Sequence, residues 1–297
     1  MRALHGGEWK VEFFKYHSLG NDFILLNAME SAIKLSPEDI RDLCDRHRGI
    51  GGDGIIVMEP SEKAVCRMVN FNPDASEADV SGNGLRCLAK HLYDTGIHAD
   101  SQMQVETPSG IRGVRVHLAM GRVGTIEVNM GKPDFRRGSI PMAGEGDEVF
   151  DIPLRVKEVT LQATCLSMGT PHCVIFVDDL LATPVSELGP QVENHPFFPL
   201  RVNAEFTQVI SVSEIRLRSW ERGAGETLAS AAGASAAVAA ALRTGRCKRK
   251  VHVQLPGGLM EVEVNDEGEI ITRGTARRVF RGVLDEDWRE RSRIFLA

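Results

Sequence analysis

One pattern of residues occurs twice in this chain, 149 positions apart, and it constrains the fold more than any other feature. The spacing within the two copies is identical, and they consist of Glu77, Ser81, Gly84, Thr95 and Gly96 and of Glu226, Ser230, Gly233, Thr244 and Gly245. In each copy a loop with a Glu leads into a turn of small residues that opens a helix, and a Gly ends that helix. Two such copies predict two similar halves that face each other across a cleft.

The length of the chain agrees with two domains. At 297 residues, each half is long enough to bury a core of its own. Gly131-Lys132-Pro133 is the best boundary, because a region rich in Gly, Ser, Pro and charge follows it. We therefore expect one domain over residues 1–133, a second over 134–277, and a tail over 278–297 that packs back on the first.

The periodicity predicts an α+β protein. Apolar residues after Ser81 recur at helical spacing, and the helix after Ser230 is almost entirely Ala, which is typical of a buried, closely packed helix. Most of the remaining chain reads as short strands separated by Gly turns. The expected fold has two pseudo-symmetric domains, each an antiparallel β-sheet wrapped around a central helix, with the cleft between them.

Composition excludes several classes of function. The net charge is −6 and the pI about 5.9, so the basic surface that nucleic-acid binding requires is missing. No apolar run reaches the roughly 18 residues of a membrane span, and the polar start does not resemble a signal peptide. The six cysteines have no zinc-type spacing, so we expect no metal. The expected location is the cytoplasm.

The predicted cleft suits a small carboxylate ligand. The free N–H groups of a helix start bind carboxylates, and Gly82-Asn83 and Ala231-Ala232 leave the backbone accessible at both starts. Arg222, next to Glu221, is a natural partner for a second carboxylate. Amide side chains in loops add further hydrogen-bonding groups, at Asn21, Asn72 and Asn203. Taken singly, these Asn residues also read as turn formers and Arg222 as a surface charge; the repeat favours an amino acid or a dicarboxylate with an amine.

Several motifs together resemble the diaminopimelate epimerase family. They extend from about Phe14 to Val283 and comprise Leu19 to Phe23, Asp45-Arg46-His47 with Gly49 to Gly54, Asn70 to Asn72, Gly82 to Cys87, Pro171 to Val174, Arg201 to Ala204 and Trp220 to Thr227. The resemblance implies two pseudo-symmetric domains, no cofactor and one substrate in the interdomain cleft. It also implies conversion of LL- to meso-diaminopimelate in lysine biosynthesis, and it suggests a homodimer.

The resemblance further implies a two-base mechanism. In the family, one cysteine thiolate takes the α-proton from one face of the substrate and a second thiol delivers a proton to the other face. The corresponding positions are Ser81 and Ser230, which makes these two serines the expected catalytic residues. The family motif also places His172 near the cleft, where it could assist a proton transfer; a buried structural His is the alternative.

The chain departs from the family pattern at several positions. A hydroxyl is a far weaker acid than a thiol, whose ordinary pKa is about 8.5, and it normally needs an adjacent base. Ser is also a preferred N-cap, so capping alone accounts for both serines. Ala231-Ala232 replaces the usual Gly-Ser or Gly-Thr pair, and Thr170 replaces an Asn that contacts the far end of the substrate.

Three functional interpretations follow. The first is an amino-acid epimerase or racemase in which the serine hydroxyls relay protons. The second is an isomerase, tautomerase or lyase of the same superfamily that uses a carboxylate base, with Glu77, Asp79 and Glu226 as candidates. The third is a homologue that binds an amino acid without catalysis. The retained Asn72, Asn203, Glu221 and Arg222 favour an amino-acid-like ligand in every case.

Overall fold

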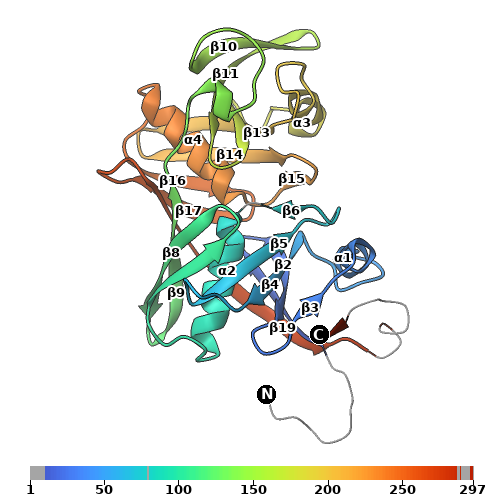
Figure 1. The fold of residues 1–297 in the computed structure, drawn as a ribbon. Helices are drawn as coiled ribbons and strands as arrows, with labels where there is room; N and C mark the ends of the chain where they lie inside the picture. The colour runs from blue at the N-terminus through green and yellow to red at the C-terminus, as the bar shows by residue number, and fades with distance from the viewer. Residues whose placement is uncertain (1–10, 79, 286–287, 289–294, 297) are drawn as a thin grey trace, which may run out of the picture.

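The computed structural model describes residues 11–78, 80–285, 288 and 295–296, and it has two lobes that contain the same succession of elements (Figure 1). Each lobe has two α-helices, one buried against the inner face of a sheet and one on its outer face. The first lobe is built from β1 (Glu12–Ser18), β2 (Asn21–Asn27), β3 (Ile33–Lys34), α1 (Pro37–Cys44), β4 (Gly54–Glu59), β5 (Cys66–Phe71), β6 (Glu77–Ala78), α2 (Gly82–Asp94), β7 (Gln102–Thr107), β8 (Gly110–Ala119) and β9 (Arg122–Gly131).

The second lobe repeats this order. It is built from β10 (Val149–Val156), β11 (Val159–Ser167), β12 (Pro171–Phe176), α3 (Val185–Glu193), β13 (Asn203–Ser211), β14 (Glu214–Glu221), β15 (Gly225–Thr227), α4 (Ala231–Arg243), β16 (Lys250–Leu255), β17 (Gly258–Val264) and β18 (Ile270–Gly274). A 3₁₀ turn, Arg137–Ser139, lies between the lobes in sequence, and β19 (Arg277–Val283) and β20 (Phe295–Leu296) follow β18. The two copies of the sequence pattern thus occupy equivalent elements, β6 with α2 and β15 with α4.

The sheets are mixed, which corrects the expectation of antiparallel sheets. Four pairs of strands run parallel: β2 with β4, β5 with β7, β12 with β13, and β14 with β16. Each of these pairs is connected through a helix, α1, α2, α3 and α4 respectively. A strand that returns through a helical crossover enters the sheet in the same direction as its predecessor, and short hairpin turns cannot make such a connection.

The core has three parts. A central cluster surrounds α2 and α4 and is continuous from one lobe to the other. Two smaller clusters lie on the outer faces of the sheets, under α1 in the first lobe and under α3 in the second. Strands such as β2 and β4 are therefore buried on both faces, which explains their uninterrupted apolar runs, Phe23–Leu26 and Ile55–Met58.

The two central helices begin and end in the same way. Ser81 and Ser230 are N-caps with nearly the same backbone conformation, and their hydroxyls accept from the amides of Gly84 and Gly233 at 3.0 and 3.1 Å. Gly96 and Gly245 follow the helices, both with φ of 72°, a conformation that an L side chain rarely adopts. In α4, the Ala residues combine high helix propensity with close packing.

Two strand pairings bind the lobes together. β9 of the first lobe pairs antiparallel with β18 of the second, so a sheet runs through the junction. β19 follows the second lobe in sequence but pairs with β1 of the first. Its position beside β1 is equivalent to the position of β10 beside β11 in the second lobe. No helix within the described residues is long and apolar enough to cross a membrane.

Candidate active site

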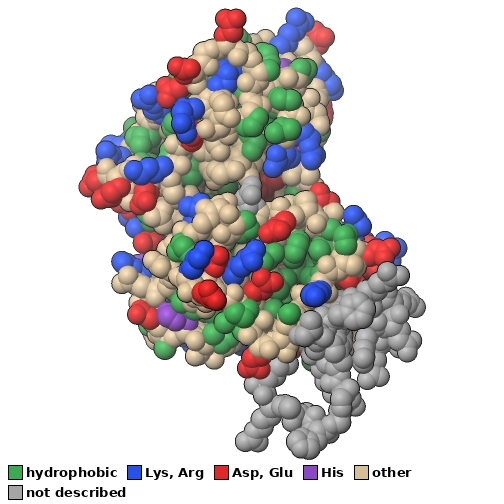
Figure 2. Space-filling view, in the orientation of Figure 1, with side chains coloured by type: hydrophobic (Ala, Val, Ile, Leu, Met, Phe, Trp, Pro, Cys, Tyr) green, Lys and Arg blue, Asp and Glu red, His purple; other side chains and the backbone are tan. Residues whose placement is uncertain are grey.

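A cavity of about 300 Å³ lies between the lobes at the N-termini of α2 and α4. The space-filling view shows the molecule indented between the two halves (Figure 2). The predicted residues that line this cavity are Asn21, Asn72, Ser81, Gly82, Asn83, Thr170, Asn203, Glu221, Arg222, Ser230, Ala231 and Ala232. His172 is not among its lining residues; it is 1% exposed and lies behind Thr170.

The starts of the two central helices touch. A β-carbon placed on Gly82 would lie 2.8 Å from Cβ of Ala231 and 2.7 Å from Sδ of Met130. Gly82 and Ala231 are the equivalent first residues of the two helices, so this contact lies where the lobes mirror each other. The free amides of both helix starts therefore converge on one site, which favours a carboxylate there.

On the side of the second lobe, Ser230 is coupled to a carboxylate. Ser230 is buried, and its Oγ donates to Oε2 of Glu221 at 3.1 Å. The hydroxyl of Thr227 donates to the other oxygen, Oε1. Burial raises the pKa of the Glu221 carboxyl to about 7, although the hydrogen bonds from Thr227 and Ser230 act in the opposite direction. Glu221 can therefore hold or release a proton near neutral pH.

On the side of the first lobe, Ser81 has no such partner. Its Oγ accepts from the Gly84 amide, and no residue in the described part of the chain accepts a hydrogen bond from it. Glu77 lines the cavity nearby and is exposed, and its carboxylate makes no hydrogen bond or ion pair with the described residues. The two serines are thus alike as helix caps but unlike in their access to a base.

A buried chain of hydrogen bonds lies behind Thr170. Nδ1 of His172 is 2.9 Å from Oε1 of Glu205, and Ser219 donates to the other oxygen of Glu205. Since a carboxylate only accepts, Nδ1 carries the proton, and Nε2 of His172 lies 3.0 Å from Oγ1 of Thr170. The hydroxyl of Thr170, which lines the cavity, is therefore held by this chain.

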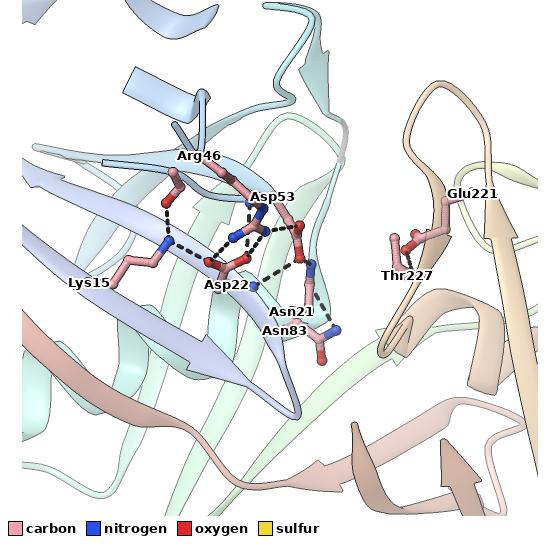
Figure 3. A network of polar contacts seen from close by, with 9 residues as sticks. Lys15, Asn21, Asp22, Arg46, Asp53, Asn83, Glu221 and Thr227 are labelled. Atoms are coloured by element: carbon pink, nitrogen blue, oxygen red, sulfur yellow. Dashed lines mark hydrogen bonds and ion pairs between the residues drawn. The ribbon is translucent and has the colours of Figure 1, made fainter. Parts of the chain in front are cut away.

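A second chain of hydrogen bonds, with an ion-pair network at one end, holds Asn21 on the opposite wall (Figure 3). Nδ2 of Asn21 donates to Asp53 at 2.9 Å, and Oδ1 accepts from Asn83 at 3.1 Å. Asp53 in turn pairs with Arg46, which also binds Asp22. Figure 3 shows Glu221 and Thr227 across the cleft from this network.

Other predicted ligand-binding residues are held by local hydrogen bonds. Oδ1 of Asn203 accepts from the backbone amide of Arg222 at 2.7 Å, and the guanidinium of Arg222 donates to the Leu200 carbonyl at 3.0 Å. Nδ2 of Asn72 donates to Ser76 at 3.0 Å. These side chains therefore shape the loops at the cavity as well as lining it.

Sequence reasoning missed several residues around the cavity. Asp53 and Thr227 lie within the motifs quoted for the family but were not assigned a role in the site. The buried Glu205 was not proposed as a site residue; parallel pairing of β12 with β13 brings it beside His172. The candidate base Glu226 is instead paired with Arg218 at 2.7 Å and does not line the cavity, and Asp79 lies outside the described residues. Within the described residues, no group of three or more His, Cys, Asp or Glu side chains is placed to hold a metal ion.

Comparisons with known proteins agree on one family. The family model described as diaminopimelate epimerase matches residues 13–136 and 164–279. The diaminopimelate epimerase of Moorella thermoacetica is 48% identical over 277 residues, covering 92% of this chain and 98% of that protein. That of Heliobacterium modesticaldum is 45% identical over 280 residues, covering 92% and 99%.

A similar fold occurs in a solved structure of much lower sequence identity. A hydroxyproline epimerase from Agrobacterium vitis superposes with a TM-score of 0.72 at 13% identity, covering 94% of this chain and 93% of that one. At this identity the likeness concerns the fold alone.

Proposed function

The chain belongs to the diaminopimelate epimerase family, and we propose that it is an isomerase that inverts an α-carbon of diaminopimelate in lysine biosynthesis without a cofactor. One observation carries the proposal. The starts of α2 and α4 meet at one cavity, and each is capped by a serine hydroxyl, of Ser81 and Ser230. The Ser230 hydroxyl donates to the carboxylate of Glu221, whose pKa is about 7.

The helix starts account for substrate binding. The α-carboxylate of the substrate would lie against the free amides at Gly82-Asn83 and Ala231-Ala232, which line the cavity together. When the α-proton leaves, negative charge develops on this carboxylate, and the same amides stabilise it. Arg222, Asn72 and Asn203 line the rest of the cavity and are available to the distant ammonium and carboxylate groups.

Glu221 gives Ser230 the base that a hydroxyl needs. Ser230 Oγ would take the α-proton while its own proton moves to Oε2 of Glu221, and the electron pair of the broken C–H bond moves into the substrate carboxylate. Ser81 would deliver its hydroxyl proton to the opposite face of the α-carbon. Glu221 then returns its proton to solvent, and water restores the proton of Ser81, so atoms and charge balance over the cycle.

The asymmetry of the serines favours a second candidate. Ser81 has no acceptor among the described residues, whereas Glu221 is a carboxylate base in the cleft. An isomerase or lyase that moves a proton on one face only would need Glu221 and Ser230 but not Ser81. This candidate corresponds to the carboxylate-base interpretation, with Glu221 in place of Glu77, Asp79 or Glu226.

Proton exchange distinguishes the candidates. The protein is incubated with LL-diaminopimelate in D₂O, and the α-proton is followed by NMR together with the stereochemistry of the product. Inversion with deuterium incorporation supports the epimerase. Exchange with retention supports the one-sided chemistry. Binding of diaminopimelate by calorimetry without any exchange would contradict both and leave a binding protein.

We also propose a homodimer that forms along β19. This strand pairs with β1 on one side, and Val279, Phe280 and Val283 are 58%, 45% and 51% exposed. An exposed apolar edge strand is a template for pairing with another strand. A two-fold register centred on Phe280 would place Val279 opposite Arg281 and Arg278 opposite Gly282, so that no two arginines face each other.

A further inference from the structure

A fully buried arginine lies next to the cleft, and the mechanism above does not use it. Arg86, in the second turn of α2, is 0% exposed and is the largest of the fully buried side chains. Burial lowers its pKa to about 10, so it remains charged at neutral pH. Among the described residues no carboxylate pairs with it: Nη1 donates to Oδ1 of Asn83 at 2.6 Å, Nη2 contacts Sδ of Met260, and Nε has no partner.

Arg86 begins a chain of amide groups that leads to the cavity. Oδ1 of Asn83 accepts from Arg86, and its Nδ2 donates both to Oδ1 of Asn21 at 3.1 Å and to the backbone carbonyl of Ala229 at 3.0 Å. Nδ2 of Asn21 donates to Asp53 at 2.9 Å. Ala229 belongs to the second lobe and precedes Ser230, so Asn83 also links the two lobes beside a candidate catalytic residue.

The groups at the two ends of this chain determine which way each hydrogen bond runs, from donor to acceptor. A guanidinium only donates and the ionised carboxylate of Asp53 only accepts, so each amide between them has one orientation. The oxygen of Asn21 thereby accepts from Asn83, and the second N–H of its amide has no partner among the described residues. Since Asn21 lines the cavity, this N–H is available to a ligand as a donor, which suits a carboxylate.

The second lobe has no equivalent of this chain. The positions 149 residues after Asn83 and Arg86 are Ala232 and Ser235. The buried hydroxyl of Ser235 donates to the carbonyl of Ala231 in its own helix at 2.7 Å. Thr170, which is 149 positions after Asn21, carries instead of an amide a hydroxyl that lies 3.0 Å from Nε2 of His172. The two walls of the cleft therefore differ in their hydrogen-bonding groups.

We propose that Arg86 is a positioning residue that acts through Asn83 to orient the Asn21 amide, so that Asn21 donates an N–H to a carboxylate of the bound ligand. The ligand in this statement rests on the proposed function, whereas the orientation of the amides concerns the protein alone.

The amide orientation is tested first, on the ligand-free protein. In ¹⁵N-labelled protein, the side-chain amide protons of Asn83 should exchange slowly, because both are buried and bonded. Arg86→Met should abolish this protection, and Arg86→Lys, which keeps a charge and a donor, should retain most of it. Ser235→Ala is the matched control at the equivalent position of the second lobe and should leave these signals unchanged. Unchanged protection in Arg86→Met would overturn the proposal.

Ligand binding then tests the consequence. Arg86→Met should weaken diaminopimelate binding about tenfold, as expected for one lost charge-directed hydrogen bond. In an Asn21→Ala background the same change should have almost no further effect, because Arg86 acts through Asn21. Equal losses in both backgrounds would indicate a merely structural role and refute the proposal.

Two further measurements cover a variant that fails to fold and a wild-type protein that does not bind diaminopimelate. If Arg86→Met fails to fold, Asn83→Ala interrupts the same chain one residue later and should show the same loss, again absent in the Asn21→Ala background. If the wild-type protein does not bind diaminopimelate, the proposed substrate is wrong, and the amide-exchange measurement still decides whether Arg86 orients the amides.

Discussion

Gly82 and Ala231 face each other across the junction of the lobes so closely that a side chain on Gly82 would require the surrounding structure to shift. They are the first residues of α2 and α4, and the two N-capping serines, Ser81 and Ser230, immediately precede them. The separation of the two hydroxyls therefore depends on how closely these two residues pack. This relationship makes the contact itself a target for mutation.

A methyl group at Gly82 should push the helix starts apart. Its β-carbon would lie 2.8 Å from the Ala231 Cβ, which is fixed to the backbone and cannot move aside alone. Gly82→Ala should therefore lower the free energy of unfolding by about 1–3 kcal/mol, measured by urea denaturation. The double variant with Ala231→Gly moves the methyl group across the junction and should recover the part of this loss that the Ala231 contact causes, whereas the contact with Sδ of Met130 at 2.7 Å remains. Gly113→Ala, where an added Cβ meets nothing within 4 Å, is the control.

The serine caps stabilise their helices independently of any catalysis. Each hydroxyl accepts from the amide three residues later, at 3.0 and 3.1 Å. Ser81→Ala and Ser230→Ala should each reduce the free energy of unfolding by about 1 kcal/mol in chemical denaturation. Only Ser230→Ala also removes a hydrogen bond to Glu221, so a much smaller loss at Ser230 than at Ser81 would contradict this account.

Glu221 should set the pH dependence of activity. Its carboxyl has a pKa of about 7 because it is buried, and only the ionised form accepts a proton from Ser230. The value of kcat/KM should therefore rise with pH through about 7, and Glu221→Gln should lower it by at least ~100-fold, as is typical for loss of a general base. A pH profile without an inflection between pH 6 and 8 would exclude this role for Glu221.

The same carboxyl should affect stability in a defined direction. Its pKa in the folded protein exceeds its ordinary value of 4.5, so folding favours the protonated form. The stabilisation is present below pH 4.5 and is lost as the pH rises to about 7. The difference in unfolding free energy between Glu221→Gln and the wild-type protein should therefore grow over this interval in favour of the Gln variant.

Cysteines at both caps test how far the site has diverged. A thiol is much more acidic than a hydroxyl, and its thiolate is stabilised at a helix N-terminus. Ser81→Cys combined with Ser230→Cys should increase inversion of diaminopimelate, measured by α-proton exchange in D₂O, and should reduce stability through the loss of two caps. If the rate does not increase, Thr170 and Ala231-Ala232 become the positions to change next.

The proposed dimer is tested along β19. Val279→Asp places a charge on the exposed edge strand and should shift the protein from dimer to monomer in sedimentation measurements. Leu181 is 83% exposed elsewhere on the molecule, so Leu181→Asp should leave the assembly unchanged. A wild-type protein that sediments as a monomer at high concentration would refute the dimer.

The central helices and the class of fold could be predicted because their signals are local. Ser81 and Gly96 bracket α2 with a cap and a left-handed glycine, and Ser230 and Gly245 do the same for α4. The parallel strand pairs could not be predicted in this way, because pairing depends on which distant strands a crossover brings together. β10 has a weak local strand signal because it contains Pro153, which is tolerated because, among the described strands, β10 pairs only with β11.

The same distinction between local signals and the pairing of distant strands applies to the residues of the candidate site. Residues next to the repeated pattern, such as Gly82 and Ala231, follow from the helix starts that the sequence marks. Glu205 was missed because parallel pairing of β12 with β13 brings it beside His172, and neither residue has a local signal for the other. The hydrogen bond between Ser230 and Glu221 depends on the return of the chain through β15, so its presence at one serine alone could not be anticipated.

The position of β19 has a consequence for biosynthesis on the ribosome. The first lobe is synthesised before the second, yet the strand that pairs with β1 follows only after β18 of the second lobe. Until that strand arrives, β1 has an open side, and neither lobe can be released as an autonomous unit. A nascent chain that stalls before residue 277 should therefore remain a client of chaperones or proteases, and splitting the gene at the lobe junction should yield two fragments that fold only when produced together.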